Sequence, residues 1–139
     1  MACSECGTST ISFSLPDEYR EYAPSAAAVV TVCPRCLTLE PAAESETVPN
    51  EATASERPAF DRISDAFPTQ PERAVPLALA IGLCTSLATN RTEIELLLRE
   101  VERVGTDPLL VLDRLIADPS VEPAIDLKRR RHQLEQLLY

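Results

Sequence analysis

Apolar residues in the second half of the chain recur with the 3.6-residue period of an α-helix. The stretch over residues 73–89 is apolar almost throughout, and stripes of leucine, isoleucine or valine follow over 91–104, 108–117 and 123–138. The connections between these four segments are short, which favours antiparallel packing of neighbouring helices. The pattern therefore predicts an α-helical bundle in this half of the chain.

Residues that end and begin helices stand at the predicted boundaries. Gly105 follows the second segment, where a left-handed residue commonly closes a helix. Asp107 and Pro108 come next, an N-cap residue followed by a residue suited to the first turn. Asp118 and Pro119 then stop the third segment. These signals predict separate helices rather than one long one.

The first predicted helix is apolar on more faces than a position in a small bundle requires. Leu77 and Ile81 lie on one face, whereas Leu79 and Leu83 lie toward another. Three alternatives remain for what packs on the second face. They are the segment over residues 60–67, the N-terminal region, and a second copy of the chain in a homodimer.

Two of the three phenylalanines lie just before the helices. Phe60, Ile63 and Phe67 are spaced at i, i+3 and i+7, which predicts a short helix with one apolar face. This face either packs on the helical core or meets a partner protein. We favour the core.

The first forty residues show the period of β-strands instead. Residues 10–15 alternate polar and apolar side chains, and residues 28–32 form a run rich in β-branched residues. Each of these segments adjoins a pair of cysteines. The pattern predicts a small β unit built around the cysteines.

Four cysteines form two matched pairs in this region. Two residues separate Cys3 from Cys6, two separate Cys33 from Cys36, and 26 lie between the pairs. This spacing lets one tight turn aim both sulfurs of a pair at one ion, and two such turns complete the four-thiolate shell of structural zinc. The spacing predicts a zinc ribbon over residues 1–40 that binds one Zn²⁺ through all four cysteines.

Neighbouring residues agree with two metal-binding turns. Gly7 follows the first pair, where a positive φ is often needed, and Pro34 restricts the second turn. A redox-active pair would leave the other pair unexplained, and two-iron clusters usually show a different spacing. Because four thiolates leave no open coordination position, the zinc is expected to be structural rather than catalytic.

Residues 41–58 separate this unit from the helices. They include three prolines, four glutamates and four alanines, with no aromatic residue, leucine or isoleucine. Such a segment buries little surface and predicts a flexible acidic linker, the alternative being an ordered excursion packed on the bundle. The expected fold is α+β, with a zinc ribbon over 1–40, a linker over 41–58 and a helical domain over 59–139.

Acidic residues outnumber basic ones, and the basic ones are nearly all arginine. The net charge is −9, and Lys128 is the one lysine among thirteen basic residues. Excess negative charge keeps a surface soluble at high salt, so the composition favours a halophilic source over an ordinary acidic protein. Residues 1–72 carry 12 acids and 4 bases (−8), whereas 73–139 carry 10 and 9 (−1). This imbalance argues against a phosphate-binding face on the ribbon.

The start of the chain and the length of its apolar runs indicate the cellular compartment in which the protein is expected. Met1 is followed by a cysteine pair without the basic and apolar regions of a signal peptide. The most apolar run, over residues 75–88, is too short to cross a bilayer. We therefore expect a cytoplasmic protein without a membrane partner, in which reduced thiols bind metal.

Side chains suited to catalysis are scarce. The chain has only three glycines and no Gly-rich phosphate loop, and no carboxylate pair adjoins a nucleophile. Cys84 lies within an apolar run and is expected to be a small buried residue. His132, the sole histidine, has no serine or cysteine constellation around it. We expect a protein that is not an enzyme and has no catalytic residues.

One basic cluster, over residues 128–132, lies on the last predicted helix. It suits contact with nucleic acid or the ribosome. It also suits a solvated helix face, because positive charge near a helix C-terminus is favourable. We favour the solvated face.

Three parts of the sequence resemble an uncharacterised haloarchaeal protein family that begins with a zinc ribbon. They are the opening MACSECG, the tract FDRISDAFPTQPERAVPLALAIGL and the ending RRRHQLEQLLY. The resemblance extends over nearly the whole chain apart from the linker, and it implies a haloarchaeal source and a zinc ribbon but no activity. The cysteine turns also resemble CPxCG-type zinc fingers, with the motif split: Cys6 is followed by Gly7 and Cys33 by Pro34.

Together these features predict a non-enzymatic adaptor or regulator that binds another macromolecule, with a protein as the favoured partner. The alternative is a nucleic-acid-associated factor of transcription or translation, which would use the ribbon and the basic last helix. Salt-dependent binding to RNA or DNA would separate the two.

Overall fold

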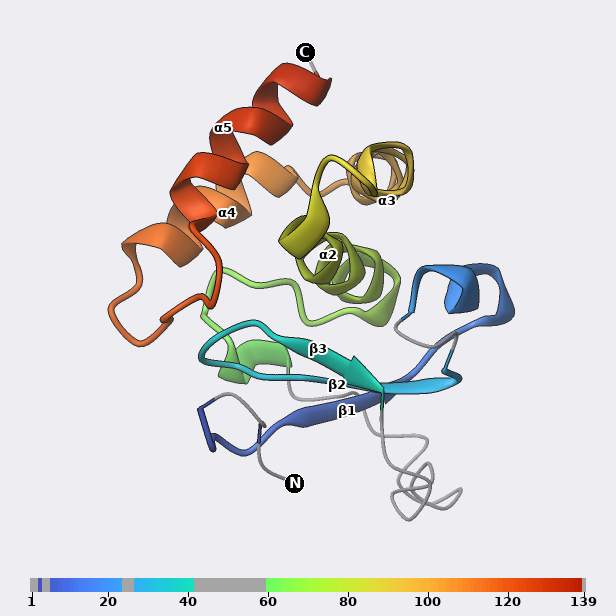
Figure 1. Cartoon of the computed structure of the whole chain (residues 1–139). Coiled ribbons are helices and arrows are strands. Elements are labelled where there is room, and N and C mark those ends of the chain that lie inside the picture. The colour runs from blue at the N-terminus through green and yellow to red at the C-terminus, as the bar shows by residue number, and fades with distance from the viewer. Residues whose placement is uncertain (1–2, 4–5, 24–26, 42–59, 139) are drawn as a thin grey trace.

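A computed structural model describes residue 3 and residues 6–23, 27–41 and 60–138. These residues form a small three-stranded antiparallel sheet and several helices, with the long helices on one side of the sheet (Figure 1). The α+β class expected from the sequence is confirmed at this level.

Three short strands make up the sheet in the order β1-β2-β3. Their bounds are β1 Ile11–Ser14, β2 Val29–Val32 and β3 Leu39–Pro41. Val32 of the central strand pairs with Ile11 on one side and with Leu39 on the other. The first two strands lie within the predicted segments. The third was not predicted, because three residues that end in proline are too few to show an alternating pattern.

Within the described residues, four helices and three 3₁₀ turns follow or interrupt the strands. The helices are α2 Pro71–Leu83, α3 Arg91–Arg103, α4 Pro108–Ala117 and α5 Leu127–Leu138, and the turns are η1 Asp17–Tyr22, η4 Phe60–Arg62 and η5 Cys84–Ser86. The bounds of α3 and α4 agree closely with the prediction. Gly105 has the expected positive φ of 97°, and the Asp107 carboxylate accepts hydrogen bonds from the N–H groups of Leu109 and Leu110.

Helix α2 is shorter than the predicted segment over 73–89, because side chains donate hydrogen bonds to the carbonyls of its last turn. The Thr85 hydroxyl donates a hydrogen bond to the Gly82 carbonyl at 3.2 Å. The Asn90 amide donates to the Leu83 carbonyl, also at 3.2 Å. These local bonds compete with regular helical ones and leave only the 3₁₀ turn η5 beyond Leu83.

Helix α5 begins at Leu127, four residues later than predicted, because Asp126 acts as its N-terminal cap. The Asp126 carboxylate accepts a hydrogen bond from the Arg129 N–H at 3.1 Å, and its carbonyl accepts one from Arg130. The residues before Asp126 keep an irregular conformation, and two of their N–H groups donate to the carbonyls of Arg35 and Cys36 in the turn of the second cysteine pair, as described below.

Helix α2 lies between the sheet and α3 (Figure 1), and its residues 74–81 are all buried. Gly82 faces the sheet so closely that a Cβ atom at this position would lie 2.8 Å from the Leu39 side chain. Both faces of α2 are therefore covered within one chain. The surplus apolar face needs no second copy to cover it, and the homodimer stays a prediction.

The phenylalanine segment belongs to the core. The Phe60 ring centroid lies 5.2 Å from that of Phe13 on β1 and 6.0 Å from that of Phe67. Phe60, Ile63 and Phe67 are each at most 2% exposed. The core interpretation is confirmed, and a partner-facing motif at these residues is wrong. Only the turn η4 is helical, so the predicted short helix is reduced to three residues.

One hydrophobic core includes side chains of both the sheet and the helices, among them Val30, Leu77, Leu98 and Leu115. The proposed boundaries at residues 40 and 58 stay a prediction, and residues 42–58 of the linker lie outside the described part. Among the described helices, none is both long and apolar enough to cross a membrane.

Candidate metal centre

The four predicted cysteines lie together at one end of the sheet. Their sulfur atoms all lie within 4.8 Å of one another, with 3.5 Å between Cys3 and Cys36 and 3.4 Å between Cys6 and Cys33. An ion held at about 2.3 Å from each sulfur of a tetrahedral shell requires sulfur separations of about 3.8 Å. The cluster has this size, so the four thiols could hold one metal ion.

The first pair lies in a turn that we call the first knuckle: Cys3, Cys6, Gly7 and Thr8. The Cys3 N–H donates to the Thr8 carbonyl at 2.8 Å, and the Gly7 N–H donates to the Cys3 carbonyl at 2.9 Å. Gly7 has a φ of 77°, and no atom lies within 4 Å of where its Cβ would be. The expected positive φ at this glycine is confirmed, and Cys6 and Gly7 are exposed.

The second pair repeats this turn in the second knuckle: Cys33, Cys36, Leu37 and Thr38. The Cys33 N–H donates to the Thr38 carbonyl at 3.0 Å, and the Leu37 N–H donates to the Cys33 carbonyl at 3.0 Å. Leu37 has a φ of 63°, a conformation that leucine rarely adopts. The two knuckles thus have the same backbone hydrogen bonds, with leucine in the second where the first has glycine.

Each knuckle also places a threonine hydroxyl beside a sulfur. The Thr8 Oγ1 atom lies 3.3 Å from the Cys6 sulfur, and the Thr38 Oγ1 atom lies 3.0 Å from the Cys36 sulfur. These threonines were not singled out from the sequence. The signal was available, because Cys-x-x-Cys-x-Thr occurs at both pairs.

The thiols differ in pKa because hydrogen bonding dominates at Cys6 and burial dominates at Cys33 and Cys36. Hydrogen bonds with Thr8 lower the pKa of the exposed Cys6 thiol to about 6. Burial raises the pKa of the Cys33 and Cys36 thiols. A bound cation would favour the thiolate at all of these positions, so binding of a metal would release protons.

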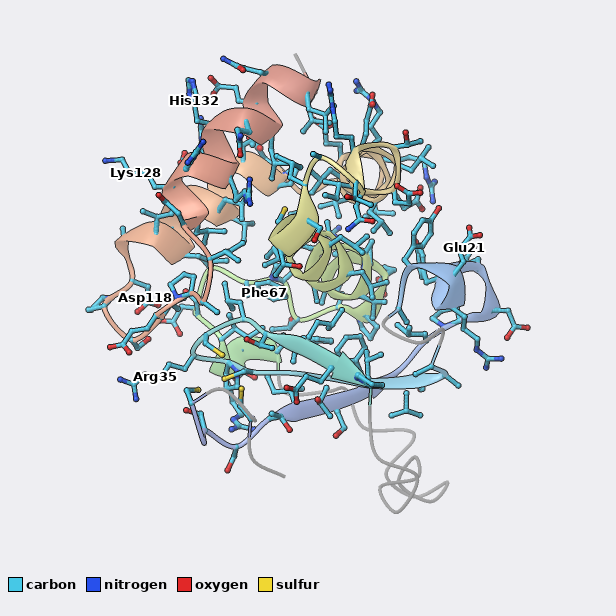
Figure 2. The ribbon with its side chains drawn as sticks, in the orientation of Figure 1. Glu21, Arg35, Phe67, Asp118, Lys128 and His132 are labelled. Atoms are coloured by element: carbon cyan, nitrogen blue, oxygen red, sulfur yellow. The ribbon has the colours of Figure 1, made fainter. Side chains whose placement is uncertain are left out.

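The second knuckle is attached to the loop between α4 and α5. The Glu122 N–H donates to the Arg35 carbonyl at 2.7 Å, and the Ala124 N–H donates to the Cys36 carbonyl at 3.0 Å. The Arg35 guanidinium also forms an ion pair with the Glu122 carboxylate at 2.9 Å. Figure 2 shows Arg35 and Asp118 on the same side of the molecule, where this loop meets the knuckle.

The chain matches one protein family, described as "Family of unknown function (DUF6276)", over residues 2–138. The chain belongs to this family. No curated protein and no solved structure matches it. The DUF6276 match extends over the cysteine cluster, the sheet and all four helices, so these parts belong to one family unit.

The fifth cysteine of this DUF6276 protein lies outside the cluster. Cys84 is 1% exposed within the main core, and burial raises the pKa of its thiol to about 12. Its expected role as a small buried residue agrees with this position. Cys3, Cys33 and Cys36 form a separate buried cluster of their own.

The predicted basic cluster lies along α5 and is divided by its contacts. Arg131 forms ion pairs with Asp113 at 2.8 Å and Glu135 at 2.5 Å. Lys128 and His132 point away from the helix in Figure 2. Lys128 and Arg129 take part in none of the ion pairs found among the described residues. Part of the cluster is thus internal to the fold and part faces solvent.

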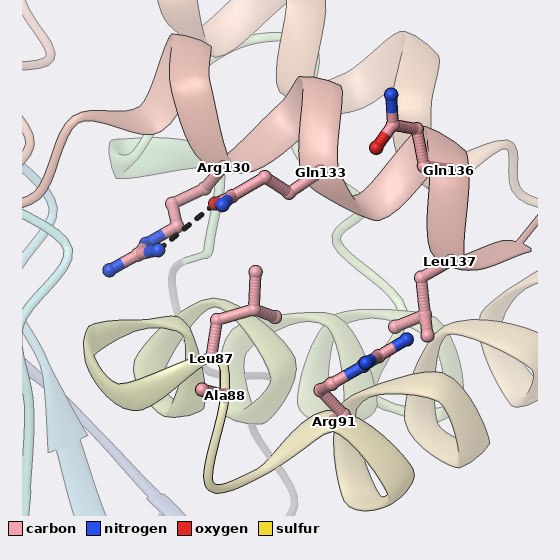
Figure 3. A pocket seen from close by; sticks show the side chains of 7 residues that line it. All are labelled: Leu87, Ala88, Arg91, Arg130, Gln133, Gln136 and Leu137. Atoms are coloured by element: carbon pink, nitrogen blue, oxygen red, sulfur yellow. Dashed lines mark hydrogen bonds between the residues drawn. The ribbon is translucent and has the colours of Figure 1, made fainter.

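A groove of about 340 Å³ lies beside this cluster, between α5 and the start of α3 (Figure 3). Arg91 and Arg130 line it, and the Arg130 guanidinium donates to the Gln133 amide oxygen at 3.0 Å. Leu87 and Leu137 supply apolar surface. Neither arginine takes part in an ion pair within the part of the chain that the structure describes.

Proposed function

We propose that this DUF6276 protein is a zinc-binding, non-enzymatic protein whose ribbon is held together by one structural Zn²⁺ on Cys3, Cys6, Cys33 and Cys36. The observation that carries this proposal is the meeting of four thiols within 4.8 Å on two turns of the same geometry. Thiolates in this number and arrangement are typical of structural zinc sites.

A structural rather than catalytic metal is supported by the donor set. Four thiolates complete a tetrahedral shell, so no position stays open for water or substrate. The sulfur atoms of Cys3, Cys33 and Cys36 belong to buried residues, which restricts access further. We therefore propose that the metal stabilises the turns and that the protein acts through binding.

The role proposed for the folded protein is that of an adaptor or regulator for a protein partner. A metal-bound ribbon joined to a helical layer offers a rigid surface, and the sequence and the site supply no reacting group. We further propose that the protein works in a cytoplasm of high salt, as its acidic, arginine-rich composition suggests.

Metal analysis tests the proposed site directly. Protein purified under reducing conditions should contain one zinc per chain, and substitution by Co²⁺ should give the visible spectrum of a tetrahedral four-thiolate site. Cys84→Ala is the matched control, because this cysteine lies outside the cluster, and it should retain the metal. Iron in place of zinc, or full metal content in Cys36→Ser, would contradict the proposal.

Affinity purification tests the proposed role. The tagged protein should retain a specific protein from a cytosolic extract in molar salt, and removal of zinc by a chelator should release that protein. Retention that persists without zinc would contradict a role for the ribbon in the complex.

Nucleic-acid binding is the second candidate, and the unpaired basic side chains on and beside α5 favour it. Lys128 and Arg129 face solvent, and Arg91 and Arg130 line the adjoining groove. Fluorescence anisotropy with a short single-stranded RNA should then show binding that weakens steeply with salt. Arg129→Gln should reduce that binding, whereas the control Arg114→Gln on α4 should not.

A further inference from the structure

Two adjoining hollows form one continuous groove between η1 and the helices α2 and α3. Their volumes are about 410 and 350 Å³, and they share Glu18, Tyr19, Glu100 and Arg103. We call this surface the tyrosine groove. Its apolar lining includes Tyr19, Tyr22, Leu96, Pro16, Val75 and Val104.

The groove is lined by two tyrosines in a chain that has few aromatic residues. Aromatic residues make up 4% of the sequence, and all three phenylalanines are buried in the core. Tyr19 and Tyr22 are only partly buried, with ring centroids 6.4 Å apart. Leu96 beside them is 56% exposed, the highest value among the large apolar residues described as exposed. Aromatic side chains that stay partly exposed are typical of protein interfaces, in which tyrosine is enriched, and Leu96 adds apolar surface beside them.

The rim of the groove is acidic. Glu18, Glu72 and Glu100 line it directly. The negative charges of Glu21 and Glu93 act on Tyr22 and raise the pKa of its hydroxyl, after the larger effect of burial. Glu18, Glu72 and Glu100 thus line the groove together with Tyr19, and Glu21 and Glu93 lie near enough to Tyr22 to affect its pKa.

The nearby arginines neutralise this rim only in part. The Arg103 guanidinium is bound by the Glu100 carboxylate, and Arg20 forms an ion pair with Asp17 at 2.9 Å. Each arginine thus balances one acid, and Glu18, Glu21, Glu72 and Glu93 remain without a basic partner among the described ion pairs. A ligand that combines positive charge with apolar surface would complement both features.

We propose that the tyrosine groove docks a basic, arginine-containing peptide segment of the protein partner. The guanidinium groups would lie over the tyrosine rings and between the carboxylates, and apolar side chains would cover Leu96. This inference rests on the proposed adaptor function and names the surface and the partner's chemistry. The chain's own residues 42–59 are a poor occupant, because they carry four glutamates and one arginine.

A peptide titration tests the groove on the zinc-loaded, full-length protein. The probe is a twelve-residue synthetic peptide with three arginines among leucines and alanines, and the matched peptide has glutamate in place of each arginine. NMR spectra should show shifts at Tyr19, Tyr22 and Leu96 with the arginine peptide and none with the glutamate peptide. The affinity should fall as the salt concentration rises.

Two exposed leucines provide a matched pair of variants. Leu96→Ser should weaken binding about fivefold or more, as expected for one interface contact. Leu110→Ser, at a leucine 49% exposed on α4, should leave the affinity unchanged. Glu18→Gln should weaken binding and reduce its salt dependence.

Three results would overturn the proposal. The first is equal binding of both peptides, and the second is equal affinity of the Leu96→Ser and Leu110→Ser variants. The third is a dimer of the free protein that Leu96→Ser dissociates, because a second copy would then occupy the groove. Metal content and zinc-dependent partner retention are measured separately, so a failed groove is distinguishable from a failed adaptor function.

Discussion

The two knuckles have the same backbone turn but lie in different surroundings. In the first knuckle Cys6 and Gly7 are exposed, and open space surrounds the glycine. In the second knuckle Cys33 is fully buried, and Leu37 is 4% exposed and belongs to the main core. The difference shows that the left-handed position of a Cys-x-x-Cys turn does not by itself require glycine.

Leu37 is tolerated because burial offsets its strain. A left-handed backbone costs a residue with a Cβ about 1–2 kcal/mol. Full burial of a leucine side chain contributes about 1.5–3 kcal/mol. The two terms are similar, with burial slightly larger, so a side chain that enters the core can occupy the position. A side chain added at Gly7 would not be buried, so only the cost of the left-handed backbone would apply there.

The largest expected effect is loss of the metal from the second knuckle. Cys33→Ser should remove the zinc and destabilise the whole fold by more than about 4 kcal/mol, because metal loss is among the few single changes of that size. Calorimetry and elemental analysis measure the two effects. Cys6→Ser should lose zinc as well, but Cys6 is exposed, so its serine adds no buried unpaired hydroxyl and the loss of stability should be smaller than in Cys33→Ser. Equal unfolding by both variants would mean that the knuckles do not differ as described.

Leu37→Gly should destabilise the fold, although it relieves strain. Removing a buried leucine side chain costs about 2–5 kcal/mol, and relief of the left-handed conformation returns about 1–2 kcal/mol. The expected net loss is about 2 kcal/mol in the free energy of unfolding, the difference between the midpoints of the two ranges, measured by urea denaturation. A stabilised variant would show that strain outweighs burial at this turn.

Gly7→Ala should destabilise the protein by only about 1–2 kcal/mol, the cost of the left-handed conformation alone. No atom lies close enough to clash with the added methyl group. Zinc content should be unchanged, and the same denaturation experiment gives the energy. An effect as large as that of Leu37→Gly would contradict an exposed first knuckle.

The smallest effect concerns the ion pair that holds the second knuckle to the α4–α5 loop. The hydrogen bond from Arg35 lowers the pKa of the Glu122 carboxyl below its ordinary value of 4.5. The stabilisation is therefore complete above that value and is lost as the pH falls through the lowered pKa. The protection factor of the Ala124 N–H, which is the intrinsic exchange rate at each pH divided by the observed rate, should fall over that acidic range more in the wild type than in Glu122→Gln. An equal fall in both proteins would show that Glu122 does not support the loop.

The sequence was sufficient where a local signal determines structure. The bounds of α3 and α4 follow from apolar stripes and caps such as Asp107, and the cysteine pairs follow from their spacing. The hydrogen bonds that join the α4–α5 loop to the second knuckle could not be predicted. Glu122 and Ala124 are distant from it in sequence, and they bond through backbone groups that any residue has. The burial of Leu37 was hidden for the same reason, since core membership depends on tertiary packing.

The hydrogen bonds from the α4–α5 loop to the second knuckle also affect the order of events during synthesis. Cys36 leaves the ribosome long before Ala124, and the two residues must close a long loop before their bond forms. A nascent chain can thus present all four thiols to a metal ion while the support behind Arg35 and Cys36 is still missing. Metal capture can come early in translation, whereas the rigid form of the site is completed only when the last two helices have emerged.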